Sequence, residues 1–162
     1  MAVLDLEPYL SKTLTPVHVK NEDEIRYRAN DKRHINGPFQ TFTIAPELTD
    51  GKRRTVDQLA KGDVMSCIVH KIAEGGENDL HCHRAQDEVW VVLEGQITFY
   101  GEDKQEIARL NPRDGLFLPR GAAYWFASTG SEAVVLLRVA ATHPSIPNER
   151  WDYGKAFDPV QV

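Results

Sequence analysis

Two histidines and a glutamate stand close together in segment 75–95, which reads GGENDLHCHRAQDEVWVVLEG. Successive side chains of an extended strand alternate between faces, so His81 and His83 point to one side and Cys82 points away. A short turn after His83 would let the chain fold back and present Glu88 to the same side. Two imidazoles and one carboxylate form a ligand set for a divalent first-row metal. The segment therefore predicts a metal-containing active site.

The ligand types indicate which metals would suit this site. Two imidazoles and one carboxylate, with open positions, are the facial arrangement of non-haem Fe(II) enzymes that bind substrate and dioxygen together. Zinc accepts the same atoms and would give Lewis-acid chemistry, and manganese and nickel are also compatible. We therefore expect one divalent metal ion held by His81, His83 and Glu88, with Fe(II) favoured.

Composition places the chain among ordinary globular proteins. Its 162 residues suit one domain with a full core, and the net charge of −5 argues against a nucleic-acid surface. The N-terminal residues MAVLDLEPYLSK lack the basic start and apolar segment of a signal peptide, and no apolar run is long enough to cross a bilayer. The two cysteines, Cys67 and Cys82, form no CxxC pair. We expect a cytoplasmic protein without nucleic-acid or membrane partners.

Short strand-like runs separated by turn residues dominate the chain from residue 64 to residue 140. The intervening segments, such as 111–115 and 128–131, are rich in glycine, proline, asparagine, aspartate and serine, which supply turn dihedrals. Many short strands with frequent turns are typical of an all-β sandwich or barrel. The expected strands cover residues 64–72, 80–83, 88–93, 96–100, 106–110, 116–118, 122–127 and 133–140.

The flanking regions have less regular patterns. Residues 39–45 could form a strand, and residues 55–58 read as a capping box that opens a short helix ending at Gly62. Residues 21–28 carry mixed charge, which favours a surface position, and the proline-containing tail 143–162 favours an irregular strap. We expect one domain made of three parts, an N-terminal extension (1–63), a β-barrel (64–140) and a C-terminal tail (141–162).

The spacing in segment 75–95 resembles the leading motif of the cupin superfamily, G-x5-H-x-H-x4-E-x6-G. Two surface histidines beside a solvated glutamate are the alternative, which five matched positions in a β-rich chain argue against. The resemblance covers about residues 64–140 and implies a single-domain, RmlC-like jelly-roll barrel with a metal in its mouth. The matched residues, with every spacing intact, are Gly75, His81, His83, Glu88 and Gly95.

The second cupin motif, G-x5-P-x-G-x2-H-x3-N, matches only at Pro119 and Gly121. Tyr124 stands at the histidine position, Ser128 at the asparagine position and Arg113 at the leading glycine. In typical members of the family that histidine is the third imidazole on the metal. Tyr124 could be a phenolate ligand, although its ordinary pKa of about 10 would have to fall. It could also be a neutral phenol that donates a hydrogen bond or acts as a general acid, or an aromatic that fills the lumen.

Four further side chains are candidates for the substrate pocket. Trp90 and Phe126 share strand faces with the glutamate and the tyrosine, so they should line the pocket, with plain core packing as the alternative. Arg138 interrupts an apolar run and would need a partner if buried. It could hold a substrate carboxylate or pair with the glutamate, but we favour a surface position at the barrel end. His70 could face the pocket, although a core histidine with satisfied hydrogen bonds is favoured.

Three function classes are compatible with these residues. The favoured one is a mononuclear metal enzyme, a non-haem Fe(II) dioxygenase of a small organic substrate. The resemblance also admits metal-dependent isomerases, dehydratases and lyases, in which Tyr124 would move a proton. The third is a non-catalytic small-molecule-binding cupin, which the intact first motif argues against. Relatives in the family commonly form dimers, and the apolar second face of 88–93 favours a homodimer, with cover by the N-terminal segment as the alternative.

Overall fold

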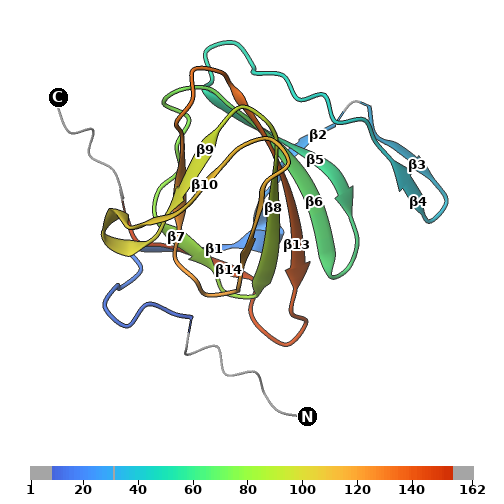
Figure 1. The fold of residues 1–162 in the computed structure, drawn as a ribbon. Coiled ribbons are helices and arrows are strands. Elements are labelled where there is room, and N and C mark those ends of the chain that lie inside the picture. Colours follow the sequence, from blue (N-terminus) through green and yellow to red (C-terminus); the bar gives the residue numbers. More distant parts are fainter. Residues whose placement is uncertain (1–8, 31, 155–162) are drawn as a thin grey trace.

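The computed structural model describes residues 9–30 and 32–154, and almost all regular structure in them is short strands (Figure 1). Two 3-10 turns, η1 (Glu22–Glu24) and η2 (Glu102–Lys104), are the only helical elements in this part of the chain. None of its helices has the length and apolar character needed to span a membrane. The strands are β1 (His18–Asn21), β2 (Arg28–Ala29), β3 (His34–Asn36), β4 (Phe39–Thr41), β5 (Arg54–Lys61), β6 (Met65–Ile72), β7 (His81–His83), β8 (Gln86–Glu94), β9 (Ile97–Tyr100), β10 (Glu106–Leu110), β11 (Gly115–Leu118), β12 (Trp125–Ser128), β13 (Val134–Thr142) and β14 (Glu149–Asp152).

Three sheets surround a common interior. A six-stranded sheet, in the order β11-β8-β13-β6-β5-β2, faces two three-stranded sheets, β1-β14-β7 and β10-β9-β12 (Figure 1). Neighbouring strands pair antiparallel except β2 with β5. A separate hairpin, β3-β4, projects away from these sheets (Figure 1). The expected all-β class is confirmed.

The strands expected between residues 64 and 140 are all present, with small shifts at their ends. The helix expected to begin at residue 55 is wrong, because this segment is strand β5. Its side chains alternate between buried and half-buried, which is the period of a strand. The Thr55 hydroxyl donates to the Glu47 carbonyl, 2.8 Å away, instead of capping a helix. The apparent capping box thus belongs to a strand whose outer face is covered by the preceding loop.

Both flanking regions add strands to the sheets. β14 lies between β1 and β7, so the chain on either side of the barrel segment closes one wall. Residues 18–29, called the N-terminal strap below, run from β1 in that sheet to β2 at the edge of the six-stranded sheet. The expectation that residues 21–28 lie on the surface is wrong for Glu22, which is buried. The strap therefore brings an acidic side chain into the interior.

Strand β8 shows how one sequence serves two environments. Its inward positions Gln86, Glu88, Trp90 and Val92 are all buried, as the alternation in the sequence predicts. On the opposite face Val89 is 45% exposed, so the described residues do not cover the outer side of this strand as expected. The inward apolar side chains form one core cluster with those of neighbouring strands. Its buried members are Ile72, Trp90, Val92, Ile97, Phe99, Leu110, Leu118, Tyr124, Phe126, Val134 and Leu136.

The two motif glycines occupy backbone positions that disfavour other residues. Gly75 and Gly95 have φ angles of +76° and +74°, a left-handed conformation that residues with a Cβ rarely adopt. A Cβ at Gly95 would also lie 2.9 Å from the Ala133 carbonyl oxygen. These glycines therefore begin and end the site segment for steric reasons, independently of any ligand.

Candidate functional site

The central side chains come from two sheets and from the residue just before β12. β8 carries Glu88 into the interior, and β7 carries His81 and His83. An isolated antiparallel bridge pairs His81 with Tyr124, with amide-to-carbonyl distances of 3.1 and 2.9 Å in the two directions. This bridge aligns the two residues, and their rings lie 4.5 Å apart. On the six-stranded sheet, Arg138 of β13 pairs opposite Trp90, one inward position from Glu88.

Glu88 is the most heavily contacted polar group of the interior. Its Oε2 accepts hydrogen bonds from Trp90 Nε1 at 2.8 Å and from the Tyr124 hydroxyl at 2.9 Å. Its Oε1 forms a close ion pair with Arg138 and lies 3.4 Å from His83 Nε2. Both oxygens therefore have at least one N–H or O–H donor from the protein. The carboxylate is buried, yet it is fully partnered by the protein itself.

The Arg138 guanidinium sets the electrostatics of this group. Burial alone would raise the pKa of Glu88, but the charge of Arg138, with His83 and the two hydrogen bonds from Arg138 and Tyr124, lowers it to about 2. In turn, burial acts to lower the pKa of Arg138, and the Glu88 charge overcomes this effect and raises it. Of the positions considered for Arg138, the surface position at the barrel end is wrong. The arginine is buried and pairs with Glu88.

Tyr124 stays a neutral phenol in this arrangement. Burial raises its pKa well above the ordinary value, and the negative charge of Glu88 raises it further. Its hydroxyl proton is donated to Glu88. A phenolate ligand would have to give up this hydrogen bond beside a carboxylate, so the geometry favours the hydrogen-bond donor among the roles considered for Tyr124.

The two histidines have different surroundings. His81 Nδ1 lies 2.7 Å from the Asp79 carbonyl oxygen, so this nitrogen carries the hydrogen and Nε2 keeps its lone pair. Burial lowers the pKa of His81 well below its ordinary value, with smaller contributions from Arg150 and His83, and keeps the ring neutral. His83 lies between two carboxylates, with Nδ1 3.1 Å from Glu22 Oε1 and Nε2 facing Glu88. Of these two histidines, only His81 therefore has a ring nitrogen, Nε2, that no carboxylate faces.

The expected metal ligands do not fit a metal ion as they are arranged here. Among the described residues, no group of three or more histidine, cysteine, aspartate or glutamate side chains could hold one. The physical reason is that Glu88 is paired with Arg138 and bonded by Tyr124 and Trp90, while both nitrogens of His83 face carboxylates. A metal at Glu88 would have to displace a buried guanidinium, whose charge already neutralises the carboxylate.

A pocket in the barrel lumen adjoins these residues. It is partly open to solvent. The expected pocket residues Trp90, Phe126, Arg138 and His70 all line it, and no acidic side chain does. The remaining lining residues are Tyr27, Arg54, Val56, Ile68, Asn78, His81, His83, Tyr124 and Arg150. We call this space the lumen pocket.

His70 differs from the expected core histidine with satisfied hydrogen bonds. It is buried, and neither ring nitrogen has a hydrogen-bond partner within the described part of the chain. Its ring lies 5.2 Å from the Trp90 ring and 6.1 Å from the Phe126 ring, centroid to centroid. Burial lowers its pKa well below the ordinary value, and the charges of Arg54 and Arg138 lower it further. His70 is thus a neutral imidazole facing the pocket with unused hydrogen-bonding capacity.

Known proteins share this architecture. The cupin domain family matches residues 68–140. Residues 68–140 are a cupin domain. A Thermus thermophilus protein, TT1209, is 25% identical, with a TM-score of 0.54 over 61% of this chain and 91% of that one. A Klebsiella pneumoniae protein with a double-stranded beta-helix domain is 15% identical, with a TM-score of 0.58 over 67% and 86% of the two chains. The cupin domain of Schizosaccharomyces pombe Cnp3 is 20% identical, with a TM-score of 0.54 over 62% and 72%. No curated protein sequence matches the chain.

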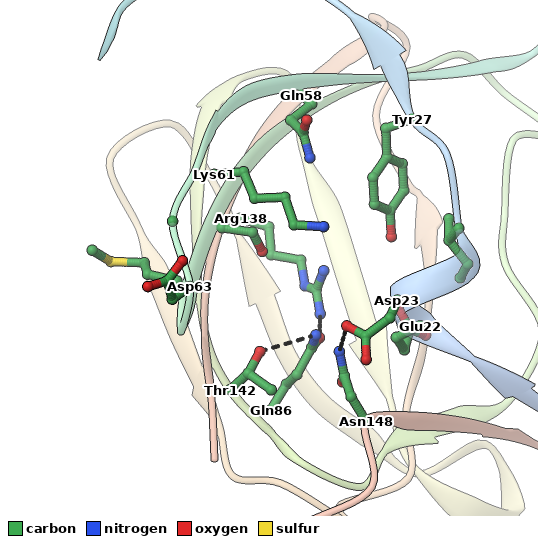
Figure 2. A pocket seen from close by; sticks show the side chains of 14 residues that line it. Glu22, Asp23, Tyr27, Gln58, Lys61, Asp63, Gln86, Arg138, Thr142 and Asn148 are labelled. Carbon is green, nitrogen blue, oxygen red and sulfur yellow. Dashed lines mark hydrogen bonds between the residues drawn. The ribbon is translucent and has the colours of Figure 1, made fainter. Parts of the chain in front are cut away.

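A second pocket lies beside the cupin lumen and shares Arg138 and Tyr27 with it. Figure 2 shows Arg138 meeting Gln86 at its inner end, with Thr142 beside the amide. The N-terminal strap, which carries Tyr27, forms one side, and Lys61 of β5 reaches in from the other (Figure 2). This side pocket is polar and contains both acidic and basic side chains. Arg138 and Tyr27 therefore lie between the lumen pocket and the side pocket.

Sequence reasoning missed several residues around the cupin lumen. Gln86, which accepts a hydrogen bond from Arg138, could have been found because it shares the inward face of β8 with Glu88. Arg54 was not recognised as a pocket residue because the segment that follows it was interpreted as a helix and not as strand β5. Glu22 and Arg150 lie outside the family motifs, and no local pattern indicates that their segments fold against β7.

Proposed function

We propose that this cupin domain binds a small organic molecule in the lumen pocket and that Arg138, in place of a metal ion, supplies the positive charge at Glu88. The observation that carries the proposal is the pairing of the Glu88 carboxylate with Arg138, Tyr124 and Trp90. Because Arg138 already neutralises the charge of Glu88 and both carboxylate oxygens have protein donors, a further cation would gain little at this carboxylate. The open hydrogen-bonding groups that remain belong to the pocket wall.

A second candidate function, acid–base catalysis on the bound molecule, is favoured by His81. Its Nδ1 is held by the Asp79 carbonyl, its ring is neutral, and its side chain lines the lumen pocket. A neutral imidazole with a fixed tautomer can accept a proton from a ligand carbon or hydroxyl through Nε2. This role suits an isomerase, dehydratase or lyase and uses no oxygen. Activity that persists without dioxygen, and is lost in His81→Gln, supports it.

The metal-dependent reactions expected from the resemblance stay predictions. His81, His83 and Glu88 would be the ligands, and Fe(II) would supply oxygen activation. For these residues to bind it, Glu88 would have to leave Arg138, and His83 would have to turn from at least one carboxylate. We assign no step to a metal for this reason.

Metal analysis tests the proposal directly. Protein purified without chelators should contain far less than one equivalent of iron, zinc, manganese or nickel, and adding these ions should not raise its melting temperature. The double variant Tyr124→His/Arg138→Met removes the phenol and the guanidinium from Glu88 and should gain metal affinity. Wild-type protein that holds one equivalent of metal, lost on mutating His81, refutes the proposal.

A further inference from the structure

One cation of the lumen pocket has no carboxylate in contact among the described residues. Arg138 is paired with Glu88, and Arg150 is paired at 2.7 Å with Asp152, a carboxylate that Lys20 also contacts. Arg54, the third arginine of the lining, makes no ion pair and no side-chain hydrogen bond within the described residues. Asp79, the carboxylate whose charge it feels, is exposed. The pocket therefore presents to its contents a guanidinium that no carboxylate contacts among the described residues.

The strand register places this cation next to His70. Val56 of β5 pairs directly with His70 of β6, so Arg54 occupies the next inward position on β5. Diagonal neighbours on one face of an antiparallel pair lie within reach of long side chains. A half-buried guanidinium and a buried imidazole without a hydrogen-bond partner thus lie on the same wall. Both groups can bond an oxygen atom placed between them.

Four apolar or aromatic side chains form another part of the wall, while the remaining lining residues are polar or charged. Val56, Ile68, Phe126 and Trp90 give the pocket an apolar lining beside the two polar groups. An arginine fork binds carboxylates through two parallel hydrogen bonds, and a burial-weakened hydration shell strengthens that contact. Apolar walls favour a ligand whose body is a ring or short hydrocarbon.

We propose that the lumen pocket binds a small organic monocarboxylate, with its carboxylate on Arg54 and His70 and its apolar body against Phe126 and Trp90. The inference rests on the proposed function, because it assigns a chemical class to the molecule bound in the lumen. One negative charge is specified because Arg54 is the single cation of the lining left without an acidic partner among the described residues. His81 Nε2 then faces the ligand from the β7 side of the pocket.

Benzoate is a suitable probe, with benzamide as its neutral counterpart of the same shape. Calorimetric titration should give benzoate binding at least tenfold tighter than benzamide, the difference expected for a charge-assisted contact. The Arg54→Gln variant should lose at least tenfold in benzoate affinity and little in benzamide affinity. It should also fold normally, because removing an unpaired cation leaves no buried carboxylate without a partner. The matched control is Arg53→Gln, an exposed neighbour that bonds the Glu74 carbonyl, and it should bind benzoate as wild type does.

The possible results separate this inference from the proposed function. Equal affinities for benzoate and benzamide, or unchanged benzoate binding in Arg54→Gln, overturn the carboxylate assignment and leave small-molecule binding in the lumen intact. If neither compound binds and the imidazole NMR signals of His70 and His81 do not shift, both proposals fail. A benzoate-induced shift of the His70 signal that is absent in Arg54→Gln supports the proposed position of the carboxylate.

Discussion

Replacing Arg138 by methionine tests the electrostatic centre most directly. The change removes a buried guanidinium and keeps an unbranched side chain of similar length, so the main loss is the ion pair with Glu88. The pKa of Glu88 falls from its ordinary 4.5 to about 2 in the folded protein, which is worth about 3 kcal/mol of stability at neutral pH. Breaking one side of a buried ion pair commonly costs about 3–5 kcal/mol. We expect a loss of unfolding free energy in this range at pH 8.

The loss of stability in Arg138→Met should depend on pH, in a direction that follows from the pKa of Glu88. In the wild type the folded pKa of Glu88 is depressed, so its contribution is present above about pH 4.5 and is lost as the pH falls toward 2. Without Arg138, burial is no longer opposed by the guanidinium charge, and the folded pKa of Glu88 rises. The folded variant then binds the additional proton, so it gains stability as the pH falls. The difference between wild type and variant should be largest at pH 8 and smaller at pH 5.

Urea unfolding at the two pH values provides the measurement. Arg109→Met is the matched control, because Arg109 pairs with Glu106 on the surface and both side chains are about half exposed. That variant should lose less than about 1 kcal/mol, with little dependence on pH. Adding Glu88→Gln to Arg138→Met should recover part of the loss by removing the unpaired charge. A cost for Arg138→Met below about 1 kcal/mol at pH 8, or one equal at both pH values, refutes the buried ion pair.

Two further predictions concern Tyr124 and the outer face of the sheet. Tyr124→Phe should lower the free energy of unfolding by about 1–2 kcal/mol and raise the pH midpoint of acid unfolding, because the phenol hydrogen bond helps to lower the pKa of Glu88. An unchanged midpoint in an acid titration contradicts this prediction. We also propose that two copies of the chain associate through the outer face, where Phe117 (59% exposed) pairs across the strands with Val89 (45% exposed). Sedimentation should then give a dimer for wild type and a monomer for Phe117→Glu, and a monomeric wild type at micromolar concentration is the contrary result.

The strands of the cupin domain could be predicted because their signals are local. Alternating side chains and turn residues mark each strand from β6 to β13 without reference to the rest of the chain. The strands contributed by the flanks were harder, since β1 and β14 are short and gain their stability from pairing with each other and with β7. β5 was misread because residues 55–58 match a capping box, whereas in the structure Thr55 bonds the Glu47 carbonyl of the preceding loop and Asp57 pairs with Arg28 of β2. In this segment, long-range contacts decide the conformation against the local sequence pattern.

In the candidate site, too, the local features could be predicted from the sequence and the long-range contacts could not. The spacing of His81, His83 and Glu88 placed them together, and strand alternation added Trp90. The partner of Arg138 could not be chosen from the sequence, because its contact with Glu88 depends on the register between β13 and β8. The carboxylate facing His83 comes from Glu22 in the N-terminal strap, far away along the chain. Such long-range contacts decide whether the motif residues face a metal or one another.

Tyr124 and Arg138 act on Glu88 as a pair. A buried carboxylate without a cation would take up a proton or leave the interior, so a lumen that keeps Glu88 needs a positive charge beside it. Arg138 supplies the charge to one carboxylate oxygen, and Tyr124, at the position where the family places a histidine ligand, donates to the other. A histidine at residue 124 with Arg138 still present would put a further ligand next to a carboxylate that is already neutralised. The retained histidines and glutamate are therefore explained by their contacts with one another and with the strap, and the departure at Tyr124 belongs to the same arrangement as the buried arginine.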